Sequence, residues 1–193
     1  MNRKYICWVD GALKGNRIEG LANPDILKGG WSCVICDEFG RILDIIYSGK
    51  TGTTNNRMEM MAVLEGLKYF TEPSTIIFMS DSEYVVRGVS KYIKENFRLK
   101  ESAANFDLWA QIYDLVDNHN VTIEWVKGHN NNSQNELADF WAQFAARCLN
   151  LPKDEYTNNS KESGEPLVSE SGTWWSNGFN SGQENGKITY SLG

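Results

Sequence analysis

Four carboxylates in this sequence stand beside predicted strand ends and helix starts, where several side chains can converge. Asp10 is the last residue of a short aromatic and β-branched segment, and Asp81 comes just after another such segment. Glu59 and Asp139 each lie in the first turns of a segment with helical periodicity. Taken singly, such residues are usually turn formers, helix caps or solvated charges. Together they would supply the oxygen ligands that Mg²⁺ prefers, and phosphodiester hydrolysis with two ions about 3.5–4 Å apart needs such a cluster.

The elements that must position these carboxylates occupy residues 1–150. We expect strands at Tyr5–Asp10, Trp31–Cys36, Arg41–Tyr47, Thr75–Met79 and Val121–Val126, and helices at Thr54–Phe70, Ser82–Ile93, Phe106–Asn118 and Glu136–Leu149. Residues 11–30 are rich in glycine, asparagine and charge, which predicts a long loop. This order of elements predicts an α/β fold, a five-stranded mixed sheet flanked by helices.

The charge of the chain argues against a nucleic-acid partner at first sight. The net charge is −6, whereas proteins that bind nucleic acid are usually basic or carry a basic patch. Half of the excess lies after Asn150, where three lysines stand against six acids, and a cation-binding cluster would account for part of the rest. The sequence has no apolar run of about 18 residues and no signal-peptide pattern at its start, so we expect a cytoplasmic protein that is not in a membrane.

The pair Cys33 and Cys36 forms a C-x-x-C motif, which in other contexts binds zinc or forms a disulfide. Here it lies in the predicted strand Trp31–Cys36, where positions i and i+3 point to opposite faces. We therefore expect buried structural cysteines and no zinc site.

The composition changes after residue 150. Residues 151–193 are polar and acidic, and they end in a segment where Trp174, Trp175, Phe179 and Tyr190 are separated by small residues. We expect a flexible acidic tail with an aromatic end. The alternatives are that this end docks back on the domain or binds a protein partner.

Several strings of this sequence resemble cellular ribonuclease H of type 1. They are Val9-Asp10-Gly11, Thr53-Thr54-Asn55-Asn56-Arg57-Met58-Glu59, Ser80-Asp81-Ser82-Glu83-Tyr84-Val85, Asp107-Leu108-Trp109, Trp125-Val126-Lys127-Gly128-His129 and Asn135-Glu136-Leu137-Ala138-Asp139. The resemblance runs in order from about residue 5 to residue 147. It implies the five-stranded fold of that family and endonucleolytic cleavage of the RNA strand of RNA–DNA hybrids.

The resemblance also implies a role for each matched residue of the catalytic centre. Asp10, Glu59, Asp81 and Asp139 would be the metal-binding and catalytic carboxylates for two Mg²⁺ ions, with Mn²⁺ as an alternative ion. His129 matches a mobile histidine that helps to move protons or to release product.

The same resemblance implies the residues that bind the hybrid. Asn55 and Asn56 would reach into its minor groove, where amides can both donate and accept hydrogen bonds. Thr54 would hold a phosphate of the DNA strand, and Trp109 would lie near the hybrid-binding protrusion. Capping of a helix by Thr54 or Asn55 is an alternative that is compatible with these roles.

The sequence departs from the family in ways that affect the grip on substrate. The loop at residues 11–30 is longer than usual, and the segment between Tyr84 and Asp107 is shorter than the basic protrusion of other members. We therefore expect a monomer with weak, salt-sensitive affinity for hybrids. Two other functions stay open: a metal-dependent DNA nuclease of the same fold, and a hybrid-binding module without catalysis.

Overall fold

A computed structural model describes residues 3–15, 27–128, 132–148, 179–184 and 187–192 of the chain. The strands are β1 (Lys4–Lys14), β2 (Lys28–Asp37), β3 (Ile42–Thr51), β4 (Thr75–Ser80), β5 (Asn120–Trp125), β6 (Phe179–Glu184) and β7 (Lys187–Leu192). The helices are α1 (Asn55–Tyr69), α2 (Glu83–Glu95), α3 (Phe106–Val116) and α4 (Ser133–Cys148). No helix in these ranges is both long enough and apolar enough to cross a membrane.

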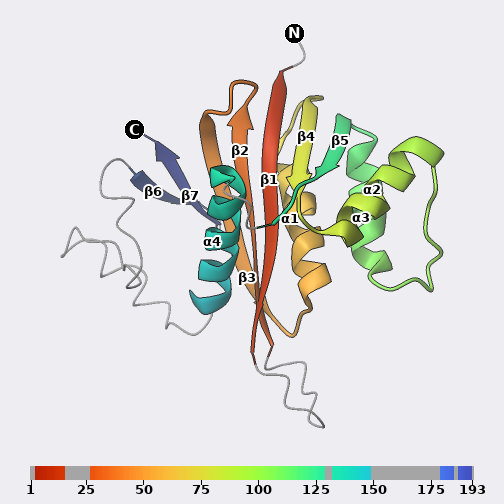
Figure 1. Cartoon of the computed structure of the whole chain (residues 1–193), viewed down its shortest axis with the longest axis horizontal. Helices are drawn as coiled ribbons and strands as arrows, with labels where there is room; N and C mark the ends of the chain where they lie inside the picture. The colour runs from red at the N-terminus through yellow and green to blue at the C-terminus, as the bar shows by residue number, and fades with distance from the viewer. Residues whose placement is uncertain (1–2, 16–26, 129–131, 149–178, 185–186, 193) are drawn as a thin grey trace.

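The strands form one mixed sheet in the order β5-β4-β1-β2-β3-β7-β6 (Figure 1). The first three strands form an antiparallel meander, whereas β4 and β5 are parallel to β1. Parallel neighbours need crossovers, and helices α1, α2 and α3 lie in these connections. The five central strands confirm the predicted five-stranded mixed sheet flanked by helices.

Helices cover both faces of the sheet, with α4 alone on one face and α1 on the other (Figure 1). Strand β2 serves both layers, because its residues alternate between them. Cys33 and Ile35 pack in the core beneath α1, whereas Val34 and Cys36 pack in the core beneath α4. The two cysteines are buried and free, on opposite faces of the sheet, as predicted.

The long loop predicted for residues 11–30 is wrong at both of its ends. Strand β1 continues to Lys14 and β2 begins at Lys28, with Gly11 paired to Trp31 and Ala12 to Gly30. The glycines that suggested a loop mark close contacts with helices, since a Cβ at Gly30 would lie 2.0 Å from the Ala142 carbonyl oxygen.

The last residues that the structure describes form two strands. Strands β6 and β7 form an antiparallel hairpin, and β7 pairs with β3 through Tyr190 and Ile45. The flexible acidic tail stays a prediction. The remaining residues of the expected tail, 151–178, 185–186 and 193, lie outside the described residues. The sequence contains Asn185-Gly186 between two β-like segments, a pair that is typical of β-hairpins.

Candidate metal centre

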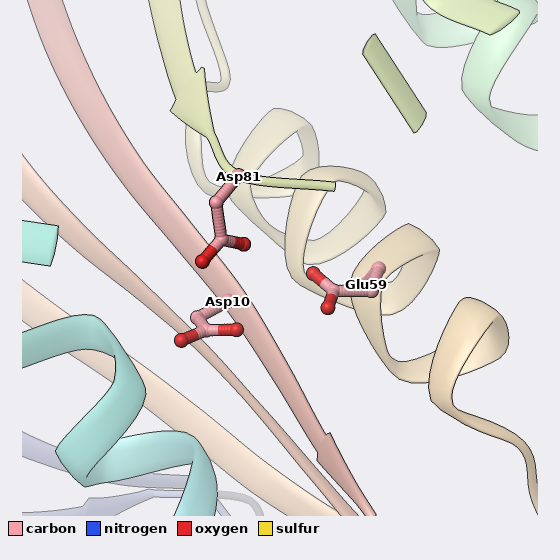
Figure 2. Close-up of side chains that lie close together, drawn as sticks. All are labelled: Asp10, Glu59 and Asp81. Atoms are coloured by element: carbon pink, nitrogen blue, oxygen red, sulfur yellow. The ribbon is translucent and has the colours of Figure 1, made fainter. Parts of the chain in front are cut away.

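Three of the four predicted carboxylates converge on one point (Figure 2). Asp10 comes from β1, Glu59 from α1, and Asp81 from the residue after β4. Each offers a carboxylate oxygen, and the three oxygens lie within 4.8 Å of one another. Since these elements are distant in sequence, only the packing of the sheet against α1 brings the three side chains together.

Asp10 lies in the middle of β1, although the sequence pattern placed it at the end of a strand. Strand β4 runs parallel to β1 and ends at Ser80, which pairs with Val9. Asp81 therefore follows β4 at the level of Asp10. The backbone N–H of Gly11 donates to Asp10 Oδ1 at 2.7 Å and holds that carboxylate in place.

Glu59 reaches the cluster because α1 packs unusually close to β1 at Gly11. A Cβ atom on Gly11 would lie 2.3 Å from the backbone nitrogen of Glu59, so only glycine allows this approach. The Asn55 amide donates to Glu59 Oε1 at 3.3 Å. Oε2 of Glu59 is buried and has no hydrogen-bond partner among the described residues.

Asp81 is held by residues at the end of β5 and just after it. Trp125, the last residue of β5, donates its indole N–H to the Asp81 carbonyl oxygen at 3.1 Å. The backbone at Gly128 lies against the Asp81 side chain, where a Cβ atom would be 2.6 Å from Oδ2. The string Trp125–Gly128 thus packs around one metal-ligand candidate.

Burial and mutual repulsion make this cluster electrostatically strained. Burial, together with the charges of Asp81 and Asp139, raises the pKa of Asp10 to about 8. Burial likewise raises the pKa of Glu59 well above its usual value, helped by the charges of Asp10 and Asp81. A divalent cation would remove this repulsion and let the carboxylates ionise at neutral pH.

Asp139 lies near the three converging carboxylates but is not part of their close group. It is half-buried on α4, and its charge acts on Asp10. The Gln143 amide, one turn further along α4, donates to both Asp139 oxygens at 2.8 Å. The structure therefore places the fourth carboxylate at the side of the cluster, oriented by a residue that the sequence patterns did not single out.

The predicted substrate residues of α1 stand at its exposed first turn. Thr54, Asn55 and Asn56 are exposed, and Thr54 Oγ1 accepts the Arg57 backbone N–H at 3.3 Å, so Thr54 does cap the helix. The Arg57 guanidinium donates to both oxygens of Asp107 at 2.8 and 2.6 Å, which anchors this turn to the start of α3.

The other two predicted residues have different outcomes. Trp109 is only 1% exposed and donates its indole N–H to the Tyr84 hydroxyl at 3.1 Å. The Trp109 ring is part of the hydrophobic core beneath α1, so it has no exposed face for a substrate. His129 lies outside the described residues.

The cluster fits a divalent cation of the Mg²⁺ type. Its donors are all carboxylate oxygens, which suit hard cations, and the nearest cysteines are buried in the core. The Oε2 atom of Glu59, which has no donor in the part of the chain that the structure describes, is the strongest indication. A buried anionic oxygen without a donor is stable only beside a cation or a proton.

Comparisons with known proteins point in one direction. A family model described as RNase H matches residues 2–147. Ribonuclease HI of Neisseria meningitidis serogroup A is 38% identical over 152 residues, which are 76% of this chain and 97% of that protein. Ribonuclease H of Trichodesmium erythraeum is 37% identical over 154 residues, 76% of this chain and 91% of that protein.

Solved structures agree on the fold. LC9-RNase H1, described as a type 1 RNase H with the type 2 active-site motif, is 26% identical with a TM-score of 0.63, over 76% of this chain and 74% of that one. The RNase H domain of prototype foamy virus has a TM-score of 0.62 at 18% identity, over 76% and 96% of the two chains. Residues 2–147, which the family model matches, include strands β1 to β5 and the carboxylates described above.

Proposed function

The chain belongs to the ribonuclease H family and is an endoribonuclease of that kind, and from this premise we propose that it cleaves the RNA strand of RNA–DNA hybrids with two divalent ions. Mg²⁺ is the proposed ion, with Mn²⁺ as an alternative. The observation that carries the proposal is the convergence of Asp10, Glu59 and Asp81, one of whose buried oxygens, Glu59 Oε2, has no donor among the described residues.

The carboxylates of the cluster would hold the ions, with Asp139 contributing from the side of α4. When bound, such ions stabilise charge on a transferring phosphate and make water a better nucleophile. Hydrolysis joins the oxygen of a water to phosphorus and breaks the bond to the 3′ oxygen. The chain's own part is to fix the positions of the reacting groups, through the Gly11 N–H at Asp10 and the Gln143 amide at Asp139.

The proposed preference for a hybrid rests on the first turn of α1. Asn55 and Asn56 are exposed beside Glu59, and their amides suit the base edges and 2′-hydroxyls of a minor groove. The Arg57–Asp107 ion pair keeps that turn rigid. Thr54 remains a proposed phosphate contact, and His129 a proposed proton carrier.

We propose that hybrid affinity is low and sensitive to salt. Three of the five cations between Tyr84 and Asp107 are engaged within the protein: Lys91 lies 3.8 Å from the centre of the Phe97 ring, Arg98 pairs with Asp117 at 3.3 Å, and Arg87 pairs with Glu83 at 2.6 Å. Those contacts compete with phosphates for the same charges.

We propose an intracellular monomer, and the free cysteines of the described residues suit a reducing compartment.

The test is a cleavage panel on hybrid, RNA duplex and DNA duplex, with and without Mg²⁺. We expect Mg²⁺-dependent cutting of the RNA strand of the hybrid alone. Cutting of the DNA duplex would favour the DNA-nuclease alternative, and binding without cutting would favour the non-catalytic module. Asp81→Asn should abolish cutting and leave hybrid binding intact, whereas Asp114→Asn, the same charge change on the exposed side of α3, should leave turnover unchanged.

A further inference from the structure

A half-exposed tryptophan stands directly beside the metal centre. Trp125 is 51% exposed, although it is the last residue of β5 and pairs with Ser80, the residue before Asp81. Its indole N–H is bonded to the Asp81 carbonyl, so the ring is held in one orientation while much of its face stays open. Core packing does not require an aromatic ring in this position, because α2 leaves it uncovered.

A shallow pocket separates this ring from the first turns of α2. Its volume is about 270 Å³, and Glu83, Val86, Arg87 and Trp125 line it. The three helical residues are spaced by three and four positions, so they share one face of α2. The pocket thus offers an aromatic wall, a short aliphatic side chain and two charged groups. Its aromatic wall, Trp125, is hydrogen-bonded to Asp81 of the metal centre.

Arg87 is available to an anion in this pocket. Its guanidinium donates to Glu83 at 2.6 Å, but the side chains are 80% and 63% exposed. A solvent-exposed ion pair of this kind contributes little, so a phosphate can replace the carboxylate as its partner. Glu83 also keeps the cation positioned over the pocket when no substrate is present.

We propose that this pocket binds one ribose–phosphate unit of the cleaved strand, next to the nucleotide that lies at the metal centre. The ribose packs on the open face of Trp125, and the phosphate is bound by Arg87. This inference rests on the proposed function, since it takes the substrate to be a nucleic-acid strand that passes Asp81. Aromatic platforms combined with a cation are a common means of holding single strands and their sugars.

Steady-state kinetics on a hybrid test the aromatic contact. Trp125→Ala should raise KM by about fivefold or more, as expected for the loss of one aromatic platform. Trp125→Phe retains a ring but has no N–H for Asp81, so its KM should stay within about twofold of the parent. Phe39→Ala is the matched control, because Phe39 is 78% exposed in the turn at the far end of the sheet.

The salt dependence of KM tests the phosphate contact. Arg87→Ala should lower the slope of log KM against log salt by roughly 0.7–0.9, the value for one phosphate. Glu83→Gln should leave that slope unchanged and lower KM, because it frees the guanidinium.

The outcomes separate this inference from the proposed function. If the parent protein does not cut hybrids, the proposed function fails. If the parent cuts but Trp125→Ala and Arg87→Ala match it in KM and salt slope, the pocket inference alone is overturned. A loss of kcat in both Trp125 variants with KM unchanged would also overturn it, since Trp125 would then only hold Asp81 in position.

Discussion

Removing the charge of Asp10 should stabilise the protein in the absence of metal while it abolishes activity. In the folded chain, burial and the charges of Asp81 and Asp139 raise the pKa of Asp10 to about 8, from an ordinary value of 3.8. Asp10 is only 6% exposed, so solvent screens this effect weakly. The substitution Asp10→Asn keeps the size of the side chain and an oxygen that can accept the Gly11 N–H.

The sign of the pH dependence follows from which state holds the proton. Between pH 4 and 8 the folded chain keeps a proton on Asp10 that the unfolded chain has lost. The free energy of unfolding of the metal-free protein therefore falls as pH rises through this window, by up to about 1.4 kcal/mol per pH unit from this group. Glu59 acts in the same direction, because its pKa is also raised.

At pH 7, protonation of Asp10 in the folded state lowers the free energy of unfolding by at most about 4 kcal/mol. This is the value for a carboxyl that stays protonated some three pH units above its ordinary pKa. Water penetration and relaxation reduce that figure. We therefore expect Asp10→Asn to raise the free energy of unfolding by about 1–3 kcal/mol. For a chain of this size such a gain raises Tm by roughly 3–10 °C.

The measurement is urea unfolding in EDTA at pH 5, 6, 7 and 8, for the parent, Asp10→Asn and a control variant. Glu38→Gln is the control, because it removes the same charge from an exposed turn. Mg²⁺ should restore stability to the parent at pH 8 and have little effect on Asp10→Asn. An Asp10→Asn protein no more stable than the parent at pH 7–8 in EDTA, or a parent whose stability is flat from pH 5 to 8, would refute the electrostatic argument.

Three further predictions concern the supports of the site. Gly11→Ala should lower the free energy of unfolding by about 1–3 kcal/mol and lower kcat at least about tenfold. The added Cβ meets the backbone of Glu59, so α1 must move. Denaturation measures the first effect and steady-state kinetics the second. Gly128→Ala should instead leave stability nearly unchanged while it weakens Mg²⁺ activation, since the atoms nearest to its Cβ belong to the movable Asp81 side chain. A Mg²⁺ titration of activity that matches the parent would contradict this. Deleting residues 151–193 should leave kcat within about twofold and cause concentration-dependent self-association, visible by light scattering, because it uncovers the edge of β3.

The central elements could be predicted from the sequence because their patterns are local. The nearly continuous apolar stretch Trp31–Cys36 indicates a strand, and the spacing of apolar residues after Thr54 indicates α1. The same local logic fails at residues 11–14 and 28–30. Glycines in these two segments suggested a loop, but in the structure they lie where α1 and α4 pack closely against β1 and β2.

The surroundings of a side chain are less predictable than its element. Trp109 and Trp125 both lie in strings typical of the family, yet Trp109 is buried against Tyr84 and Trp125 is half exposed. Sequence spacing does not encode this difference, because each exposure depends on how α2 packs. The hairpin of β6 and β7 was missed for another reason: the acidic composition before it outweighed the short Asn185-Gly186 signal.

The sequence by itself indicated the family of the chain and four candidate carboxylates, since both depend on residue types in fixed local strings. Only the tertiary structure decided that Asp10, Glu59 and Asp81 form the close group, with Asp139 at its side. It also decided that one Glu59 oxygen has no donor among the described residues and that the pKa of Asp10 is raised to about 8. These properties arise from burial and from charges on distant segments, and such interactions depend on distances in space that no spacing along the chain fixes.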